Sequence, residues 1–168
     1  DFAQVFGVHP ARKYDGAAYH DIAAALTSAV SPAASLEFVR RLALAAVTGN
    51  GDMHLKNWSL IYPGDGTEPR LAPVYDQLST VPYLPADAMA LSLGGERVFK
   101  ALSASRWRAF AHRAKLPEPA VMKAVVETVA RVNDHWWTLP ERDVVPTAVL
   151  DRIDAHVKTM TPILSNWA

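Results

Sequence analysis

The sequence contains no cysteine, which excludes disulfide bonds, thiolate nucleophiles and sulfur-ligated metal centres. It has no apolar run long enough to cross a bilayer, and its first residues have neither the basic start nor the apolar core of a signal peptide. We therefore expect a soluble, cytoplasmic protein without a membrane partner. The 17 basic and 17 acidic side chains cancel, so no global positive charge favours direct nucleic-acid binding.

An initiating methionine is also missing, and we expect the chain to be a piece of a longer protein. Its 168 residues, half of them apolar, suit one domain with a hydrophobic core of its own. No internal repeat or low-complexity tract divides the sequence. These properties predict a single structural unit over residues 1–168.

Apolar residues recur at helical spacing in five segments, which are bounded by serines, glycines or prolines. The expected helices cover residues 17–30, 32–47, the segment from Ser103 or Ser105 to Lys115, 119–139 and 146–160. Pro162 is expected to end or kink the last of them. The tryptophans expected to fill the helical core are Trp107, Trp136, Trp137 and Trp167.

Two segments interrupt the helical pattern. Residues 1–15 are expected to form a short helical turn and a loop, because Gly7, Pro10 and Gly16 break any period. Residues 77–96 contain two prolines and a pair of glycines, which favour a loop, with Leu91–Leu93 as a short strand.

The nine residues from Gly49 to Asn57 hold more hydrogen-bonding and metal-binding side chains than any other window of the chain. They directly follow an alanine- and leucine-rich helix pattern, which Gly49 and Gly51 end. Asp52 and Asn57 stand five residues apart, and Lys56 lies between them. This window is the strongest candidate for a functional site.

A hairpin is expected directly after this window. Residues 58–62 and 70–75 are typical of strands, and residues 63–69, rich in glycine and proline, are typical of a turn. The returning strand ends at Asp76. Because the two strands of a hairpin lie side by side, Asp76 should return to a place beside Asn57.

This order of residues matches the catalytic elements of protein kinases. There, an Asp that accepts the proton of the substrate hydroxyl precedes a magnesium-binding Asn by about five residues, and a second metal-binding Asp follows after a strand-turn-strand. Each residue alone is also common in turns, but Asp52, Asn57 and Asp76 in this order favour a phosphoryl-transfer site. A zinc or two-carboxylate hydrolase site that includes His54 is the weaker alternative, because no second histidine follows at metal-binding spacing.

Four stretches together resemble one known family. They are Gly-Asn-Gly-Asp-x-His-x-Lys-Asn at 49–57, Leu-Ala-Pro-x-Tyr-Asp-x-Leu-Ser-Thr at 71–80, residues 2–7 with Lys13-Tyr14, and residues 89–95. The combination closely resembles the C-terminal part of the HipA-like serine/threonine kinases, the toxins of bacterial toxin-antitoxin pairs. The resemblance implies a mainly α fold, the helical C-terminal lobe of a protein-kinase-like protein with one small β-hairpin at its active face.

The resemblance also implies a function and a site. The complete protein would phosphorylate protein hydroxyls using ATP and Mg²⁺, with Asp52 and Lys56 as catalytic residues. Asn57 and Asp76 would hold the metal, and His54 would join them as a cofactor-binding residue. The implied partners are a DNA-binding antitoxin and a protein substrate such as an aminoacyl-tRNA synthetase.

The sequence departs from conventional protein kinases in ways that the HipA-like family shares. Gly51 stands where an Arg usually precedes the catalytic Asp, and Gln77-Leu78 stands where Phe-Gly usually follows the metal-binding Asp. No stretch reads as a glycine-rich phosphate loop or as the small lobe with its ATP-binding lysine, so the isolated chain is expected to be inactive. Two alternatives remain: a small-molecule phosphotransferase lobe, which typically has His in place of Asn50, and a non-catalytic binding domain.

Overall fold

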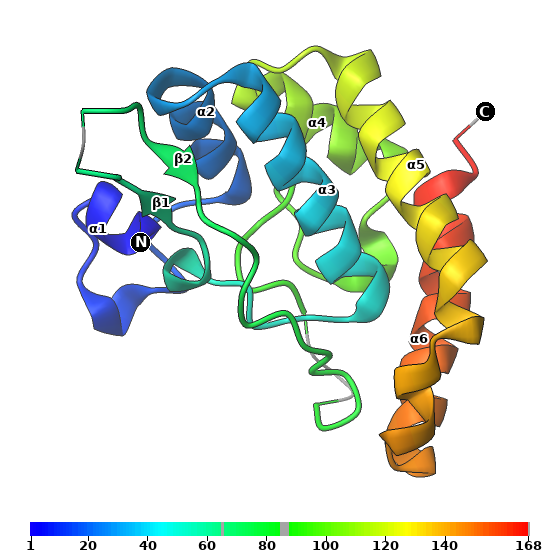
Figure 1. The fold of residues 1–168 in the computed structure, drawn as a ribbon. Helices are drawn as coiled ribbons and strands as arrows, with labels where there is room; N and C mark the ends of the chain where they lie inside the picture. The colour runs from blue at the N-terminus through cyan, green and yellow to red at the C-terminus, as the bar shows by residue number, and fades with distance from the viewer. Residues whose placement is uncertain (65, 85–87, 168) are drawn as a thin grey trace.

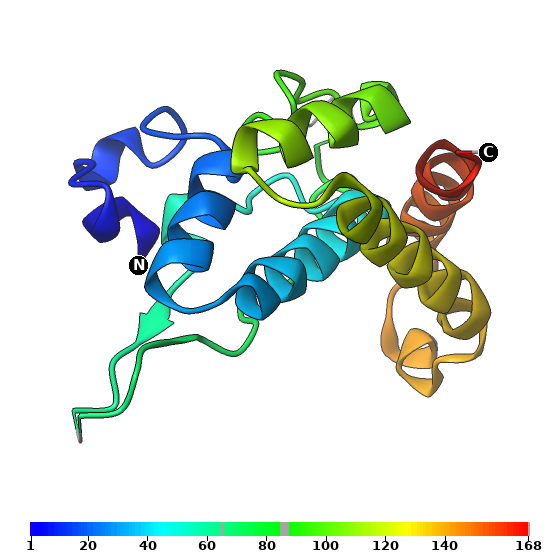
Figure 2. The ribbon, with the colours of Figure 1, turned by 90° about the horizontal axis from the view of Figure 1, so that it is seen from above.

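The computed structural model describes residues 1–64, 66–84 and 88–167. In this part of the chain, α-helices form a single body and two short strands form a hairpin at its edge (Figure 1). The helices are α1 (Phe2–Val5), α2 (Tyr19–Ala29), α3 (Pro32–Thr48), α4 (Ala104–Ala114), α5 (Glu118–His135) and α6 (Thr147–Ser165). The two ends of the chain lie on opposite sides of the molecule in both views (Figures 1 and 2).

Helix α3 is the centre of the fold and packs against α2, α5 and α6. It begins as the sequence predicts, because Oγ of Ser31 accepts a hydrogen bond from N of Ala34 and Pro32 occupies the first turn. It ends at Gly49, whose φ of 77° lies in the left-handed region that glycine favours. The position of this end sets where the following loop starts.

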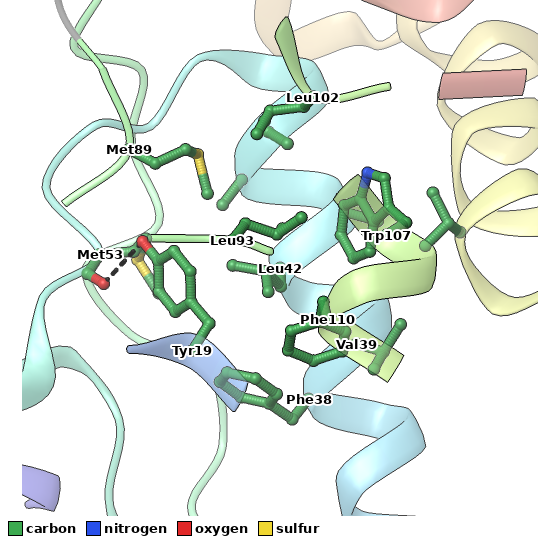
Figure 3. Packing of buried hydrophobic residues seen from close by; sticks show 14 of the residues in the cluster. Tyr19, Phe38, Val39, Leu42, Met53, Met89, Leu93, Leu102, Trp107 and Phe110 are labelled. Carbon is green, nitrogen blue, oxygen red and sulfur yellow. Dashed lines mark hydrogen bonds between the residues drawn. The ribbon is translucent and has the colours of Figure 1, made fainter. Parts of the chain in front are cut away.

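One part of the core lies between α2, α3 and α4, as Figure 3 shows, and the same cluster extends to α5 and α6. Tyr19 from α2, Phe38 and Leu42 from α3, and Trp107 and Phe110 from α4 are fully buried and belong to one cluster. The rings of Trp107 and Phe110 meet edge to face at 5.9 Å between centroids. This core holds α3, and therefore the loop that follows it, in place.

The hairpin is present but shorter than the sequence suggests. Strand β1 (Leu60–Ile61) pairs antiparallel with β2 (Arg70–Leu71), with Leu60 opposite Leu71. Figure 2 shows it projecting from the helical body. Part of the expected turn, Asp65, lies outside the described residues, as does Pro85 in the expected loop after the hairpin.

Two local expectations are wrong, and a third is wrong in part. Residues Leu91–Leu93 do not form a strand, because the only ladder pairing of that segment is a single bridge between Leu93 and Glu96. Pro162, expected to end or kink the last helix, does not end it: α6 runs through it to Ser165, and Leu164 in the last turn is fully buried. Trp137 is 37% exposed and not part of the core, because the chain changes from α5 to a 3₁₀ turn one residue earlier.

The remaining expectations about helices are confirmed to within a few residues. The helix expected over 119–139 ends at His135, and its last residues continue as a 3₁₀ turn, Trp136–Thr138. A second 3₁₀ turn, Pro140–Val144, leads towards α6. Among the described residues, no helix combines the length and the apolar character needed to span a membrane.

Candidate active site

The loop after α3 is tied to the core through one carbonyl. O of Met53 accepts hydrogen bonds from the hydroxyl of Tyr19 at 3.1 Å and from Nε1 of Trp58 at 3.3 Å. Figure 3 shows the first of these bonds entering the cluster. Because Tyr19 and Trp58 are buried, these two hydrogen bonds fix the backbone of the loop to the core.

The side-chain amide of Asn50 joins the two parts of the candidate site. Its Oδ1 accepts from N of Asp52 at 3.0 Å, and its Nδ2 donates to O of Asp76 at 3.1 Å. Asn50 is fully buried, so the Asn50 side of each bond is shielded from water. The backbone of Asp76 is thereby fixed beside that of Asp52, although 24 residues separate them.

Thr80 makes a second tie between the same two segments. Its Oγ1 accepts from N of Gly51 at 2.8 Å and donates to O of Gly49 at 3.1 Å. N of Thr80 also donates to O of Gly49, at 2.8 Å. The segment after Asp76 therefore closes over the start of the loop.

Asp52 presents its carboxylate at the surface while its backbone is held from below. Its side chain is 40% exposed. Nδ2 of Asn57 donates to O of Asp52 at 2.8 Å, and the hydroxyl of Tyr14 donates to Oδ1 of Asp52 at 2.5 Å. A partly exposed, oriented carboxylate of this kind can accept a proton from a bound hydroxyl group.

His54 lies behind this carboxylate. Its side chain is only 6% exposed, and its Nε2 is 3.9 Å from Oδ1 of Asp52. Burial lowers the pKa of His54, and the nearby Asp52 acts in the opposite direction. The ring meets that of Tyr14 edge to face at 5.1 Å between centroids. His54 is therefore a mainly neutral packing group at pH 7, and its role in cofactor binding stays a prediction.

Asn57 and Asp76 offer oxygen atoms of the kind that Mg²⁺ prefers. Nδ2 of Asn57 donates to O of Asp52, and a metal-binding role for its Oδ1 stays a prediction. Asp76 is exposed and has a φ of 56°, a left-handed conformation that Asp tolerates better than most residues. Two such ligands fit Mg²⁺, which usually completes its shell with water and substrate phosphates.

No zinc-type cluster accompanies them. In residues 1–64, 66–84 and 88–167, no three side chains from His, Cys, Asp and Glu are placed to share a metal ion. The zinc-site alternative therefore finds no support in the described part of the chain.

Lys56 is exposed beside the buried Asn57, and its backbone links the loop to the hairpin. O of Lys56 accepts from the hydroxyl of Tyr75 at 2.7 Å, and that hydroxyl is 2.6 Å from Oγ of Ser59. The expected return of the hairpin to the loop is thus confirmed at Tyr75, directly before Asp76. A catalytic role for the Lys56 side chain stays a prediction.

Reasoning from the sequence did not assign roles to Tyr14, Asn50 or Thr80. Tyr14 stands in a stretch that carries the family resemblance, and Asn50 stands in the candidate window, but no spacing rule pairs them with a partner. Thr80 carries no signal beyond its place in the second motif. All three act through contacts between segments distant in the sequence.

The helical body, the hairpin and the loop between them have the architecture of a kinase-type C-terminal lobe. A family model described as "HipA-like C-terminal domain" matches residues 1–136. The chain therefore belongs to the HipA-like C-terminal domain family, as its sequence motifs predict.

Two relatives from Sinorhizobium fredii carry the name kinase. "Putative kinase Y4dM" is 44% identical over 161 residues, which are 95% of this chain and 39% of that protein. "Putative kinase Y4mE" is 34% identical over 145 residues, which are 79% of this chain and 34% of that protein. The chain thus spans well under half of the length of either relative.

A solved structure of a Shewanella oneidensis HipA complex has the same fold. It superposes with a TM-score of 0.76 over 98% of this chain and 42% of that chain, at 17% sequence identity. That structure is described as a toxin-antitoxin system of HipA, HipB and operator DNA. At this identity the likeness establishes the fold alone.

Proposed function

We propose that this chain is the catalytic lobe of a protein kinase that transfers the γ-phosphate of ATP to serine or threonine hydroxyls. The observation that carries the proposal is the buried amide of Asn50, which holds the backbones of Asp52 and Asp76 together. Because phosphoryl transfer depends mainly on positioning and charge neutralisation, a rigid link between the proposed base and metal ligand suits this chemistry.

Each residue of the site has a proposed task. Asp52 accepts the proton of the substrate hydroxyl. The oxygen of that hydroxyl bonds to the γ-phosphorus, and the bond between this phosphorus and the ADP oxygen breaks. Asn57 and Asp76 hold Mg²⁺, which neutralises phosphate charge when bound. Lys56 reaches the transferred phosphoryl group from the exposed side of the loop, and His54 supports Asp52 from behind.

The partners of the complete protein are also proposals. Because the HipA of the similar structure is found with HipB and operator DNA, we propose a DNA-binding antitoxin as a partner. The phosphorylated target would be a cytoplasmic protein, for which an aminoacyl-tRNA synthetase is a candidate. The nucleotide-binding elements that this sequence lacks would come from the rest of the longer polypeptide.

The test is phosphoryl transfer by the full-length protein and its variants. Asp52→Asn and Asp76→Asn should each lower the transfer of labelled phosphate from ATP to lysate proteins by at least about a hundredfold, since general-base and charge effects are of this order. Asp76→Asn should also weaken Mg²⁺-dependent ATP binding, whereas Asp52→Asn should not.

Asp151→Asn, on the exposed side of α6, is the matched control and should leave transfer unchanged. Near-normal turnover by both site variants would rule out the proposed site. Transfer to metabolites but not to proteins would favour a small-molecule phosphotransferase instead.

A further inference from the structure

A second concave surface lies along α3 and α5. It is a groove of about 510 Å³ between the two helices, which run side by side in Figure 1, and Val74 also lines it. Asp52, Lys56, Asn57 and Asp76 do not line it. We refer to it as the α3–α5 groove.

The floor of the α3–α5 groove is apolar. Leu44 from α3 and Val132 from α5 contribute to it, together with Trp136 from the following 3₁₀ turn, Val74 and Leu139. Val74 is 49% exposed and Leu139 is 39% exposed. Clustered apolar side chains that remain open to water are typical of surfaces that bind another molecule.

The rim of the groove is basic. Arg131 is exposed, and no carboxylate lies within ion-pair distance of it among the described residues. Nη1 of Arg40 is 3.8 Å from the carboxylate of Glu37, a long and partly exposed pair. Arg41 differs, because it is bound to Glu37 at 2.9 Å and to O of Ala72 at 2.6 Å.

The single carboxylate of Glu37 is thus shared by Arg40 and Arg41, and Arg131 is left to attract a ligand. Positive charge along the edge of an apolar floor is complementary to a segment that alternates acidic and bulky apolar side chains. The lining of α3 runs from Glu37 to Thr48, which is about 16 Å along the helix axis. About five residues of extended chain span that length.

We propose that the α3–α5 groove binds a short acidic segment of a partner protein, with leucine or tryptophan side chains on the apolar floor and carboxylates at Arg131 and Arg40. None of the proposed catalytic or metal-binding residues lines the groove, so the proposal does not depend on kinase activity. It assigns partner recognition to the side of the lobe formed by α3 and α5.

The probe is a fluorescein-labelled peptide in which Asp and Glu alternate with Leu and Trp, titrated with the full-length protein and followed by anisotropy. Its control is the same peptide with Lys at every acidic position. The acidic peptide should bind in the micromolar range and the basic one should not. Arg131→Glu should weaken binding about tenfold, because it replaces an attraction by a repulsion.

Lys123→Glu is the matched control. Lys123 lies on the same helix as Arg131, and its replacement by Glu makes the same change of charge. Both residues are four positions from Glu127, Lys123 before it and Arg131 after it. Lys123 does not line the groove, so the variant should bind normally. Leu139→Ser should weaken binding of the acidic peptide without changing the charge of the rim.

Three outcomes overturn the proposal. The first is no binding of the acidic peptide, and the second is equal binding of the acidic and basic peptides. The third is self-association of the unliganded protein that Leu139→Ser abolishes, since that would assign the groove to a second copy of the chain.

Discussion

The hydroxyl of Tyr14 donates a 2.5 Å hydrogen bond to Oδ1 of Asp52, across 38 residues of sequence. Nζ of Lys13 lies 5.0 Å from the centroid of the Tyr14 ring, and O of Lys13 accepts from N of Leu55 at 3.2 Å. The N-terminal segment is therefore a wall of the candidate site. Tyr14 fixes one carboxylate oxygen of Asp52 while the side chain stays 40% exposed to a substrate.

Tyr14→Phe in the full-length protein should lower kcat by about tenfold, because a hydrogen bond to a charged group is lost at the proposed base. The KM for ATP should change little, because this hydroxyl binds the carboxylate of the proposed base, Asp52. Tyr62→Phe is the control: Tyr62 is 68% exposed, and its kcat should equal that of the parent protein. Steady-state kinetics on both variants tests this, and an unchanged kcat for Tyr14→Phe would show that Tyr14 does not assist the proposed base.

Asn50→Ala should lower the free energy of unfolding by about 2 kcal/mol, because it leaves the amide of Asp52 and the carbonyl of Asp76 without their buried partner. Asn133→Ala, at an exposed position of α5, should change it by less than about 0.5 kcal/mol. Urea denaturation of the isolated chain measures both. Equal effects would mean that the Asn50 link contributes nothing special to stability.

Asp154→Asn should destabilise the protein in a pH-dependent way. Arg142 binds this carboxylate through two hydrogen bonds of 2.9 and 2.8 Å and lowers its pKa, with Nε1 of Trp136 as a further donor at 2.7 Å. Because the pKa is lower in the folded state, the stabilisation is fully present above the unfolded value of about 3.9 and is lost as pH falls through the folded pKa.

The gap in unfolding free energy between the parent protein and Asp154→Asn should therefore be about 1–2 kcal/mol at pH 7 and should shrink below about pH 4. Asp151→Asn, one turn away on the exposed side of α6, should show little gap at either pH. Chemical denaturation at pH 7 and pH 3 provides the comparison. A gap that persists unchanged at pH 3 would contradict an ion-pair origin.

Gly94→Ala and Gly64→Ala should differ sharply, although both glycines have a positive φ. At Gly94 a Cβ would lie 2.0 Å from O of Arg106, whereas at Gly64 it would meet nothing within 4 Å in the described part of the chain. Gly64→Ala should cost about 1 kcal/mol of backbone strain, and Gly94→Ala at least about 3 kcal/mol because the backbone of α4 must also move. Thermal melts of the two variants test this, and similar melting temperatures would contradict the close approach.

The isolated chain should fold cooperatively but should neither bind ATP tightly nor transfer phosphate. The cluster around α3 closes a core within residues 1–168, so folding needs no further element. Catalysis does, because positioning of the phosphates is most of what such an enzyme supplies and no glycine-rich loop is present in this sequence. Calorimetric titration with Mg²⁺ and ATP should show no micromolar binding; such binding would reveal a phosphate-binding element in this chain.

Local signals in the sequence predict most of the fold. The Ser31-Pro32 cap and Gly49 place α3 almost to the residue, since capping and left-handed glycine are properties of a few adjacent residues. Packing overrides local rules elsewhere. Pro162 is accommodated inside α6 because the buried Leu164 holds the last turn against the core, and Trp137 faces water beside Arg142 and Lys158.

For the site, motif spacing and turn chemistry are local, so they predict the order Asp52, Asn57, Asp76 and a hairpin that returns the chain. The contacts that orient these residues form only in the folded protein. Tyr14 and Asn50 reach partners 38 and 26 residues away, through contacts that exist only once α3 is packed and the N-terminal segment lies against the loop. No local pattern encodes such pairs, because their geometry is set by the whole core.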